Sequence, residues 1–257
     1  MIKTYSAFTY GHTITDDNSA IIFNEGAGEL IAYIEIGSYT LQAFVNAVAI
    51  ALNDTGNLEY TVSLDRSTRK ITISSTGAFD LLITSGSLVE TSVFSLMGFD
   101  GADLTGLTSY EGDSASGSYF EPQFLLQSYV DFDDNVKTEN ASVNKTPNGD
   151  VEVVSYGKFK FMECNITLQT NIKQGEGSCL KNDPTGYDNL RAFLEYATNK
   201  APMEFIKDIS QPSIYIDCLL ESTRESSDGV NYKVKELYSK GFAEYYESGL
   251  IVFRKLI

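Results

Sequence analysis

The sequence lacks tryptophan and contains a single histidine, His12. A catalytic histidine needs a nucleophile or an acid within hydrogen-bonding reach, and no serine or cysteine motif accompanies His12. We therefore expect His12 to be a surface residue of an N-terminal arm. The missing tryptophan removes the side chain on which sugars most often stack, which argues against a glycosidase that works with two buried carboxylates.

Cysteines are few, and long apolar runs are absent. The three cysteines form an odd set, which argues against a complete disulfide framework. Cys164 and Cys218 stand inside expected strands, where a thiol behaves as a small apolar residue. No run approaches the ~18 apolar residues of a spanning helix, and the N-terminus has no apolar segment of the signal-peptide kind. We expect free thiols, a reducing cytoplasm as the place of synthesis, and no membrane contact.

Basic residues are scarce as well. The chain has 19 lysines and arginines against 35 acidic residues, a net charge of −16. Such a field repels phosphate backbones, so direct binding of nucleic acid is not expected. It suits a solvated surface, a basic partner or bound cations. Two acidic clusters lack the EF-hand spacing, so no metal or cofactor is expected, with calcium as the open alternative. The clusters are Asp100 with Asp103, and Asp131 with Asp133, Asp134 and Glu139.

Residues that favour strands and residues that favour turns are both frequent, which indicates a mainly β fold of the α+β class. The length suits two ordinary domains or one large all-β domain. A segment rich in Gly, Ser and Asp at 100–118 is the best candidate linker. We expect an N-terminal arm at 1–20, a strand–helix–hairpin module at 21–112 and a β-rich assembly domain at 119–257.

The module is expected to contain a strand pair, a helix, a hairpin and a short helical turn. Apolar residues alternate in the strands, and they recur at i, i+3 and i+4 in the helix. Ser38 and Thr40 are both candidate N-caps of that helix. Gly98 would end the helical turn. The expected bounds are 21–23 and 30–36 for the strand pair, 41–52 for the helix, 60–64 and 70–75 for the hairpin, and 93–97 for the helical turn.

The second half is expected to form a β-sandwich or open barrel with one helix packed on it. That helix is amphipathic and is bracketed by Pro184 and Pro202. A Tyr-rich segment at 241–249 is expected to be a loop. The other expected elements are a helix at 187–198 and strands at 124–132, 136–143, 151–172, 203–206, 213–220, 232–237 and 251–255.

The order of motifs in the module resembles a unit that recurs in structural proteins of tailed bacteriophages and large DNA viruses. The step Gly37-Ser38-Tyr39-Thr40 enters the helix, YTVSLDRSTRKITISSTG (60–77) forms the hairpin, and SLMGFD (95–100) closes the unit. The resemblance covers about a third of the chain. It implies a virion protein, most often of the tail tip or baseplate. The strand-rich second half is similar in outline to the β domains of distal tail and baseplate ring proteins.

The expected function is therefore non-enzymatic: a homo-oligomeric ring, hexamer or trimer, around the tail axis that contacts neighbouring tail proteins. Tyrosines are frequent in interfaces, so an aromatic group near the C-terminus is the candidate intersubunit contact, with simple core packing as the alternative. The alternative is a receptor- or carbohydrate-binding tail module, which exposed aromatics on the module loops would favour. A tail-associated hydrolase is a third class that no motif supports. The aromatic group consists of Tyr238, Phe242, Tyr245 and Tyr246.

Overall fold

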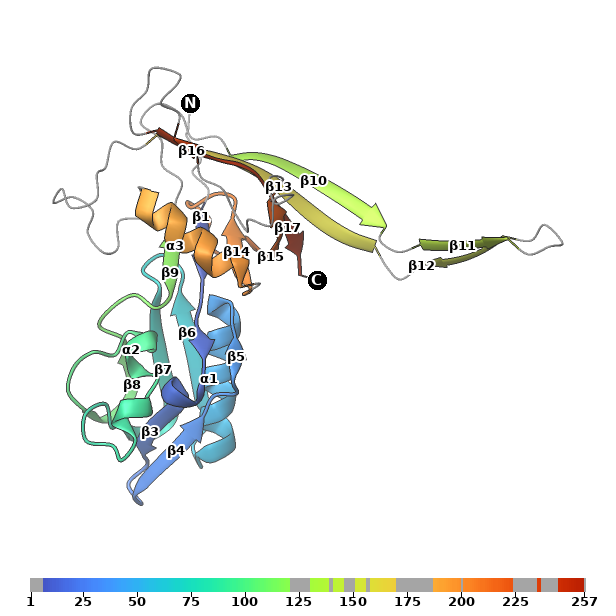
Figure 1. Cartoon of the computed structure of the whole chain (residues 1–257). Helices are drawn as coiled ribbons and strands as arrows, with labels where there is room; N and C mark the ends of the chain where they lie inside the picture. Colours follow the sequence, from blue (N-terminus) through green and yellow to red (C-terminus); the bar gives the residue numbers. More distant parts are fainter. Residues whose placement is uncertain are drawn as a thin grey trace. The chain divides into compact units, whose positions relative to one another are not determined.

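The fold is mainly β with three α helices among the described residues, which confirms the expected α+β class. The computed structural model describes residues 7–120, 130–138, 141–145, 151–155, 158–169, 187–199, 201–223, 235–236 and 245–256. The chain forms two compact units, whose elements are labelled in Figure 1. We call Phe8–Tyr119 together with Ala201–Tyr215 the helix–hairpin unit. We call Met1–Ala7, Phe120–Lys200 and Ile216–Ile257 the long-strand unit.

The helix–hairpin unit contains the elements that the sequence predicts for the module, together with several that it does not. The 12-residue strand β7 is the longest of its strands. The elements are β1 (Ala7–Tyr10), β2 (Thr13–Ile14), the 3-10 helix η1 (Asp16–Asn18), β3 (Ala20–Asn24), β4 (Glu29–Tyr33), β5 (Gly37–Ser38), α1 (Leu41–Thr55), β6 (Tyr60–Asp65), β7 (Lys70–Leu81), η2 (Val89–Thr91), α2 (Phe94–Met97), β8 (Leu104–Glu111), β9 (Ser118–Phe120) and β14 (Met203–Ile206).

Strand β7 is the centre of a five-stranded antiparallel sheet. Its first half pairs with β6, from Lys70 opposite Asp65 to Ser75 opposite Tyr60, as the predicted hairpin requires. Its end pairs with β3, which in turn pairs with β4. Strand β8 pairs along the same stretch of β7 as β6 does, and so lies on the opposite edge. A second group, β14, β1 and β9, follows in that order in another sheet.

Helix α1 packs against β6 and β4. It begins after Thr40, whose side chain accepts a hydrogen bond from Ala43 N, so Thr40 and not Ser38 is the N-cap. It ends at Thr55, where the N–H of Gly56 binds the carbonyl of Leu52. Its inward residues recur at i, i+3 and i+4, as predicted. They are Leu41, Phe44, Val45, Val48, Ala51 and Leu52.

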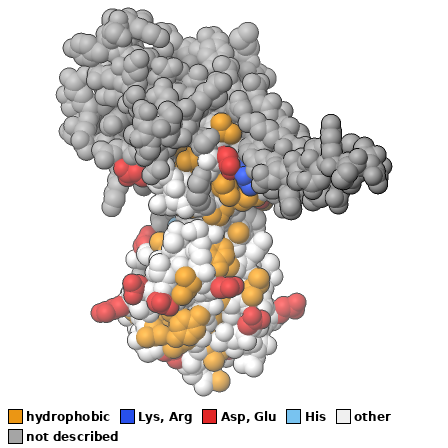
Figure 2. Space-filling model, turned by 45° about the vertical axis from the view of Figure 1, so that its right-hand side comes forward, with side chains coloured by type: hydrophobic (Ala, Val, Ile, Leu, Met, Phe, Trp, Pro, Cys, Tyr) orange, Lys and Arg blue, Asp and Glu red, His pale blue; other side chains and the backbone are white. Residues whose placement is uncertain are grey.

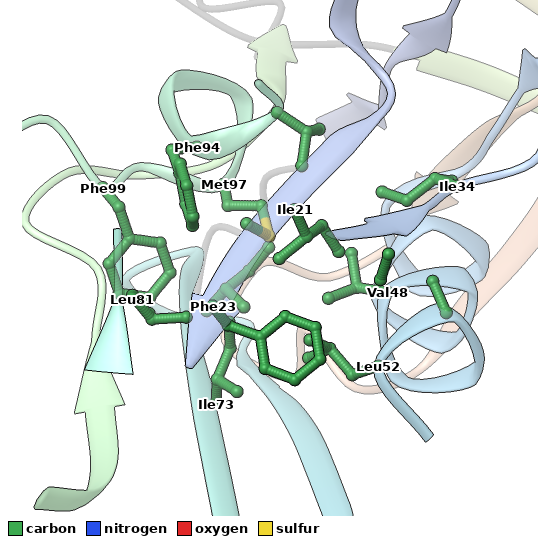
Figure 3. Packing of buried hydrophobic residues seen from close by; sticks show 14 of the residues in the cluster. Ile21, Phe23, Ile34, Val48, Leu52, Ile73, Leu81, Phe94, Met97 and Phe99 are labelled. Carbon is green, nitrogen blue, oxygen red and sulfur yellow. The ribbon is translucent and has the colours of Figure 1, made fainter. Parts of the chain in front are cut away.

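The core of this unit lies between α1 and the sheet, and it continues to α2. Figure 3 shows Val48 and Leu52 of α1 facing Phe23 of β3, with Phe94 and Phe99 on the far side of the strand. Each large apolar side chain buried in this way contributes about 1.5–3 kcal/mol. Gly98 ends α2 with a φ of 85°, in the left-handed region that glycine adopts without strain.

The segment predicted as a linker, 100–118, contains a strand of the helix–hairpin unit. Leu104–Glu111 forms β8, which pairs with β7 and buries Tyr110. The Tyr110 hydroxyl donates to the carbonyl of Phe79 at 2.8 Å and fixes β8 to β7. Most other side chains of β8 are exposed, because β8 lies at the edge of the sheet. An edge strand needs little apolar character, and its sequence therefore reads as a loop.

The long-strand unit is built on an antiparallel sheet in which β10, β13, β17 and β15 follow in that order, and β16 pairs with β17. Strands β11 and β12 form a separate pair. Helix α3 buries Phe193, Leu194 and Ala197, and the ring of Phe193 lies 6.4 Å from that of Phe253 in β17. The elements are β10 (Val130–Thr138), β11 (Ala141–Lys145), β12 (Val151–Ser155), β13 (Lys158–Gln169), α3 (Tyr187–Thr198), β15 (Tyr215–Thr223), β16 (Lys235–Glu236) and β17 (Tyr245–Lys255).

Two predictions for this half need correction. The sequence predicts separate strands at 124–132 and 136–143, whereas Val130–Thr138 is one strand, β10, which pairs with β13, and β11 pairs with β12. The Tyr-rich loop at 241–249 is partly a strand, because β17 begins at Tyr245 and pairs with β13. The packed helix α3 is confirmed, with the predicted bounds. The finer expectation of a sandwich or barrel stays a prediction.

The compact units do not follow the chain in simple order. Strand β1 of the expected N-terminal arm 1–20 belongs almost wholly to the helix–hairpin unit, and so does Ala201–Tyr215 from the second half. The expected boundaries at 21–112 and 119–257 do not include 201–215 in the first unit. Local composition does not indicate that a late segment of the chain packs with an early one.

Candidate functional site

An open groove runs beside α1 on its exposed side, between the helix and residues 33–39. Its volume is about 440 Å³. Three alanines of α1, at 43, 47 and 51, form part of its lining. Tyr33 and Ile50 also line the groove, and they are 59% and 61% exposed. The groove therefore presents apolar surface to solvent on a rigid helix.

The groove follows from the spacing of residues on α1. Residues three or four positions apart lie on one face of a helix. Ala43, Ala47, Ile50 and Asp54 have this spacing and line the groove, although Ala47 also packs against the edge of the core; Phe44 and Val48 face into the core. The small alanine side chains at two of these positions leave a depression on the helix surface, and Ile50 lies next to it.

The lining of the groove carries acidic groups. Glu35 and Asp54 contribute to it, and among the described residues no lysine or arginine does. The Tyr39 hydroxyl donates to the carbonyl of Glu35 at 2.7 Å. Burial, followed by the nearby Glu35 charge, raises the pKa of Tyr39, so this tyrosine stays neutral. Figure 2 shows hydrophobic and acidic side chains gathered on the same face of the helix–hairpin unit. Such a groove suits an apolar side chain with a cation beside it.

A fully buried carboxylate links three elements of the same unit. Glu204 of β14 is 0% exposed. It accepts hydrogen bonds from Arg66 in the β6–β7 turn at 2.7 Å, from Gln42 N at the start of α1 at 2.8 Å, and from Thr9 of β1 at 3.1 Å. Arg66 also donates to the Gln42 side chain and stacks over the ring of Tyr215, 3.8 Å from its centroid. The free-energy cost of burying the Glu204 carboxylate is thus offset by three hydrogen-bond donors, one of which is charged.

Sequence reasoning did not identify Glu204 or Arg66. The available signal was a single acid inside the apolar strand Met203–Ile206, all four residues of which are buried. A carboxylate in such a strand requires a cation or several N–H donors. Its partners, however, lie 138, 162 and 195 residues away in the chain. No local pattern identifies them.

His12 is not a surface residue, and this expectation is corrected. Its Nε2 accepts from Gly117 N at 3.1 Å and lies 3.0 Å from Ser116 Oγ. Its ring packs edge-on against Phe44, with 4.7 Å between the centroids. Burial lowers the pKa of His12 to about 4, although a backbone hydrogen bond with Leu96 acts in the opposite direction. His12 is therefore a neutral packing residue at pH 7.

The acidic cluster of Asp100 and Asp103 holds loops together. Asp103 accepts from Thr84 N at 2.7 Å and from Ser85 N at 3.2 Å, while Asp100 accepts from Ser114 Oγ at 2.7 Å. Burial alone would raise the pKa of Asp103, but these hydrogen bonds together lower it. Among the described residues no group of three or more His, Cys, Asp or Glu side chains is arranged to hold a metal ion.

The second acidic cluster and the aromatic group fall mostly on parts of the chain where side chains are not described. Asp131, Asp133 and Asp134 lie in β10, and Glu139 lies outside the described residues. Tyr238 and Phe242 also lie outside them. Tyr245 and Tyr246 begin β17, opposite Gln169 and Leu168 of β13. Their role as an intersubunit contact stays a prediction.

Within the part of the chain that the structure describes, no helix combines the length and apolar character needed to cross a membrane. Cys218 is buried in β15, where the sequence placed it in a strand. Comparison with protein-family models and with curated protein sequences finds no match to the chain. The functional interpretation consequently rests on the residues and their geometry.

Proposed function

We propose that the chain is a non-enzymatic structural component of a bacteriophage tail or baseplate, and that it binds neighbouring tail proteins through the groove beside α1. The observation that carries the docking proposal is the groove itself, with its exposed Tyr33 and Ile50 and its two acidic groups. The assignment to a virion rests on the order of motifs in the module, whose strand pair, helix and hairpin form a single packed core.

The partner that fits the groove is a protein segment with an apolar side chain next to a lysine or arginine. The apolar side chain would cover the alanines of α1, and the cation would lie near Glu35 and Asp54. Charge complementarity of this kind raises association rates and excludes acidic partners. In this proposal the long-strand unit builds a homo-oligomeric ring, hexamer or trimer, and the groove connects the ring to its neighbours.

The test is co-purification of the chain with each structural protein encoded beside it, before and after Ile50→Glu. We expect the variant to weaken the complex at least tenfold, because a buried carboxylate would stand among acidic groups without a partner. Leu107→Glu is the matched control, since Leu107 on β8 is 59% exposed and Ile50 is 61% exposed. Equal loss in both variants, or no complex with any neighbour, would contradict docking through the groove.

The mass of the purified chain, measured by light scattering and combined with electron micrographs, tests the ring separately. A closed assembly with a central hole supports it. A receptor- or carbohydrate-binding tail module is the second candidate. Among the described residues, the large apolar side chains with high exposure are aliphatic apart from Tyr33, so no aromatic cluster on the module loops favours that candidate.

A further inference from the structure

The β6–β7 turn contains all the basic residues of 8–119, a segment that is otherwise acidic. Residues 8–119 contain 14 acidic and three basic residues, and the three basic ones, Arg66, Arg69 and Lys70, all lie within five positions at this turn. Arg66 is compensated by Glu204, and Lys70 lies 3.4 Å from Glu111. Arg69 forms no ion pair with any carboxylate among the described residues; its Nη1 donates to the carbonyl of Gly117 at 3.2 Å.

Arg69 is also held in an unusual backbone conformation. Its φ is 58°, and among the described residues it is the one non-glycine with positive φ. Glycine or asparagine is the ordinary choice at such a position, because a Cβ atom crowds the backbone there. A charged side chain at a strained backbone position favours a functional role for that side chain.

The Arg69 side chain lines a pocket of about 350 Å³. The ring of Tyr119 lies 5.2 Å from its guanidinium carbon. Burial lowers the pKa of Arg69, and the groups that oppose this effect are the tyrosines 119 and 10, not carboxylates. The guanidinium stays charged at neutral pH nonetheless. The pocket is also lined by Arg66 and by three apolar residues, Ile206, Ile209 and Pro212.

We propose that this pocket binds a carboxylate, with the Arg69 guanidinium as its counter-ion. A guanidinium presents paired N–H donors that match the two oxygens of a carboxylate. The apolar walls fit the alkyl stem of a carboxylic acid. One uncompensated cation matches one negative charge, whereas a phosphate carries ≈ −1.5 to −2 and would meet repulsion from the acidic unit. The proposal does not depend on the proposed function.

The carboxylate has two sources, a free acid or a glutamate or aspartate of another protein chain. The first is tested by NMR titration of the full-length protein with butyrate, following the amides of Ser67 and Gly117. Butyramide serves as the neutral isostere, and inorganic phosphate as the competing anion. We expect butyrate to shift these amides with millimolar affinity and butyramide to leave them unchanged. Phosphate binding as tight as that of butyrate would overturn the assignment.

The variant Arg69→Gly removes the guanidinium at a position where glycine relieves strain, so its melting temperature should not fall. We expect it to bind butyrate at least tenfold more weakly, and Arg69→Lys to bind at intermediate strength. The second source is tested by sedimentation velocity of the same proteins. Self-association lost in Arg69→Gly, with no butyrate binding in wild type, assigns the carboxylate to a second copy. Absence of both effects overturns the proposal.

Discussion

At the residue scale, the location of His12 makes the helix–hairpin unit sensitive to acid. The ring accepts a hydrogen bond from Gly117 N and packs against Phe44, so a proton on Nε2 would replace an acceptor by a donor. Burial lowers the folded-state pKa to about 4, below the value of about 6.5 in an unfolded chain. The unfolded state therefore binds the proton more readily between pH 6.5 and 4.

We accordingly expect the free energy of unfolding to fall as the pH drops from 6.5 to 4, with His12 contributing roughly 2–3 kcal/mol to the fall at 1.36 kcal/mol per pKa unit. The contribution is fully present above pH 6.5. Urea unfolding across this range, compared with His12→Gln, isolates it from the titration of carboxylates. The glutamine oxygen keeps an acceptor for Gly117 N and does not titrate. Parallel curves for the two proteins would show that His12 has no part in the acid sensitivity.

His12 shows that sequence neighbours alone do not predict the burial of a residue whose partners are distant in the chain. Its sequence neighbours are polar and predict a surface position. The contact that buries it comes from Gly117, which is 105 residues away in the chain. Thr40 shows the opposite case. A cap acts within its own helix turn, so the sequence restricted the N-cap to Ser38 or Thr40, and the geometry selected Thr40.

At the element scale, Glu204 holds β14, α1 and the β6–β7 turn together. Removal of one partner of a buried ion pair leaves the other charge uncompensated, and Arg66 is 11% exposed. We expect Glu204→Ala to lower the free energy of unfolding by about 3 kcal/mol, since the change also leaves the N–H of Gln42 without its acceptor. Urea unfolding of the purified variant measures this.

Glu111→Ala is the matched control for this prediction. It removes the carboxylate that pairs with Lys70, but the Glu111 side chain is 61% exposed and the Lys70 side chain is 32% exposed, so the pair is far less buried than Arg66–Glu204. A surface pair of this kind contributes about 0–1 kcal/mol. A loss for Glu204→Ala no larger than that for Glu111→Ala would mean that the buried network does not hold the three elements.

Elements with strong local patterns are predicted from the sequence, whereas the largely exposed edge strand β8 is not. The helix at 41–52, the hairpin and the helix at 187–198 have apolar periodicity that the core enforces, and each forms. Strand β8 has a largely exposed pattern and pairs with β7 through its backbone. Backbone pairing leaves no residue-type signature, so the composition of 104–111 predicts a linker where β8 forms.

At the scale of the whole molecule, the helix–hairpin unit is completed by a segment from late in the chain. Ala201–Tyr215 supplies β14, and Phe205 packs against Phe8 with 4.9 Å between the ring centroids. The groove and its helix come from the first 119 residues, but the buried partner of Arg66 does not.

A fragment that ends at Tyr119 should therefore be unstable. It loses the burial of Met203, Phe205 and Ile206 as well as the Glu204 network. At about 1.5–3 kcal/mol for each large side chain, this loss is comparable to the whole stability of a domain. Circular dichroism melting should show no cooperative transition. A fragment carrying 201–215 after Tyr119 on a long Gly/Ser linker should recover the transition. Cooperative melting of the short fragment near the full-length temperature would contradict the prediction.

The placement of three basic residues in one turn has a consequence at long range. Residues 8–119 carry 14 carboxylates spread along the segment, whereas the three cations of the segment lie at 66–70, so positive charge in this part of the unit is concentrated at one turn. The unit is an electric dipole. In the field of an anionic particle the unit experiences a torque before any contact. It therefore approaches the particle with the β6–β7 turn in front. Salt above about 0.15 M shortens the range of that torque to less than ~8 Å. The unit is therefore oriented before docking only at low ionic strength or at short distance from the particle.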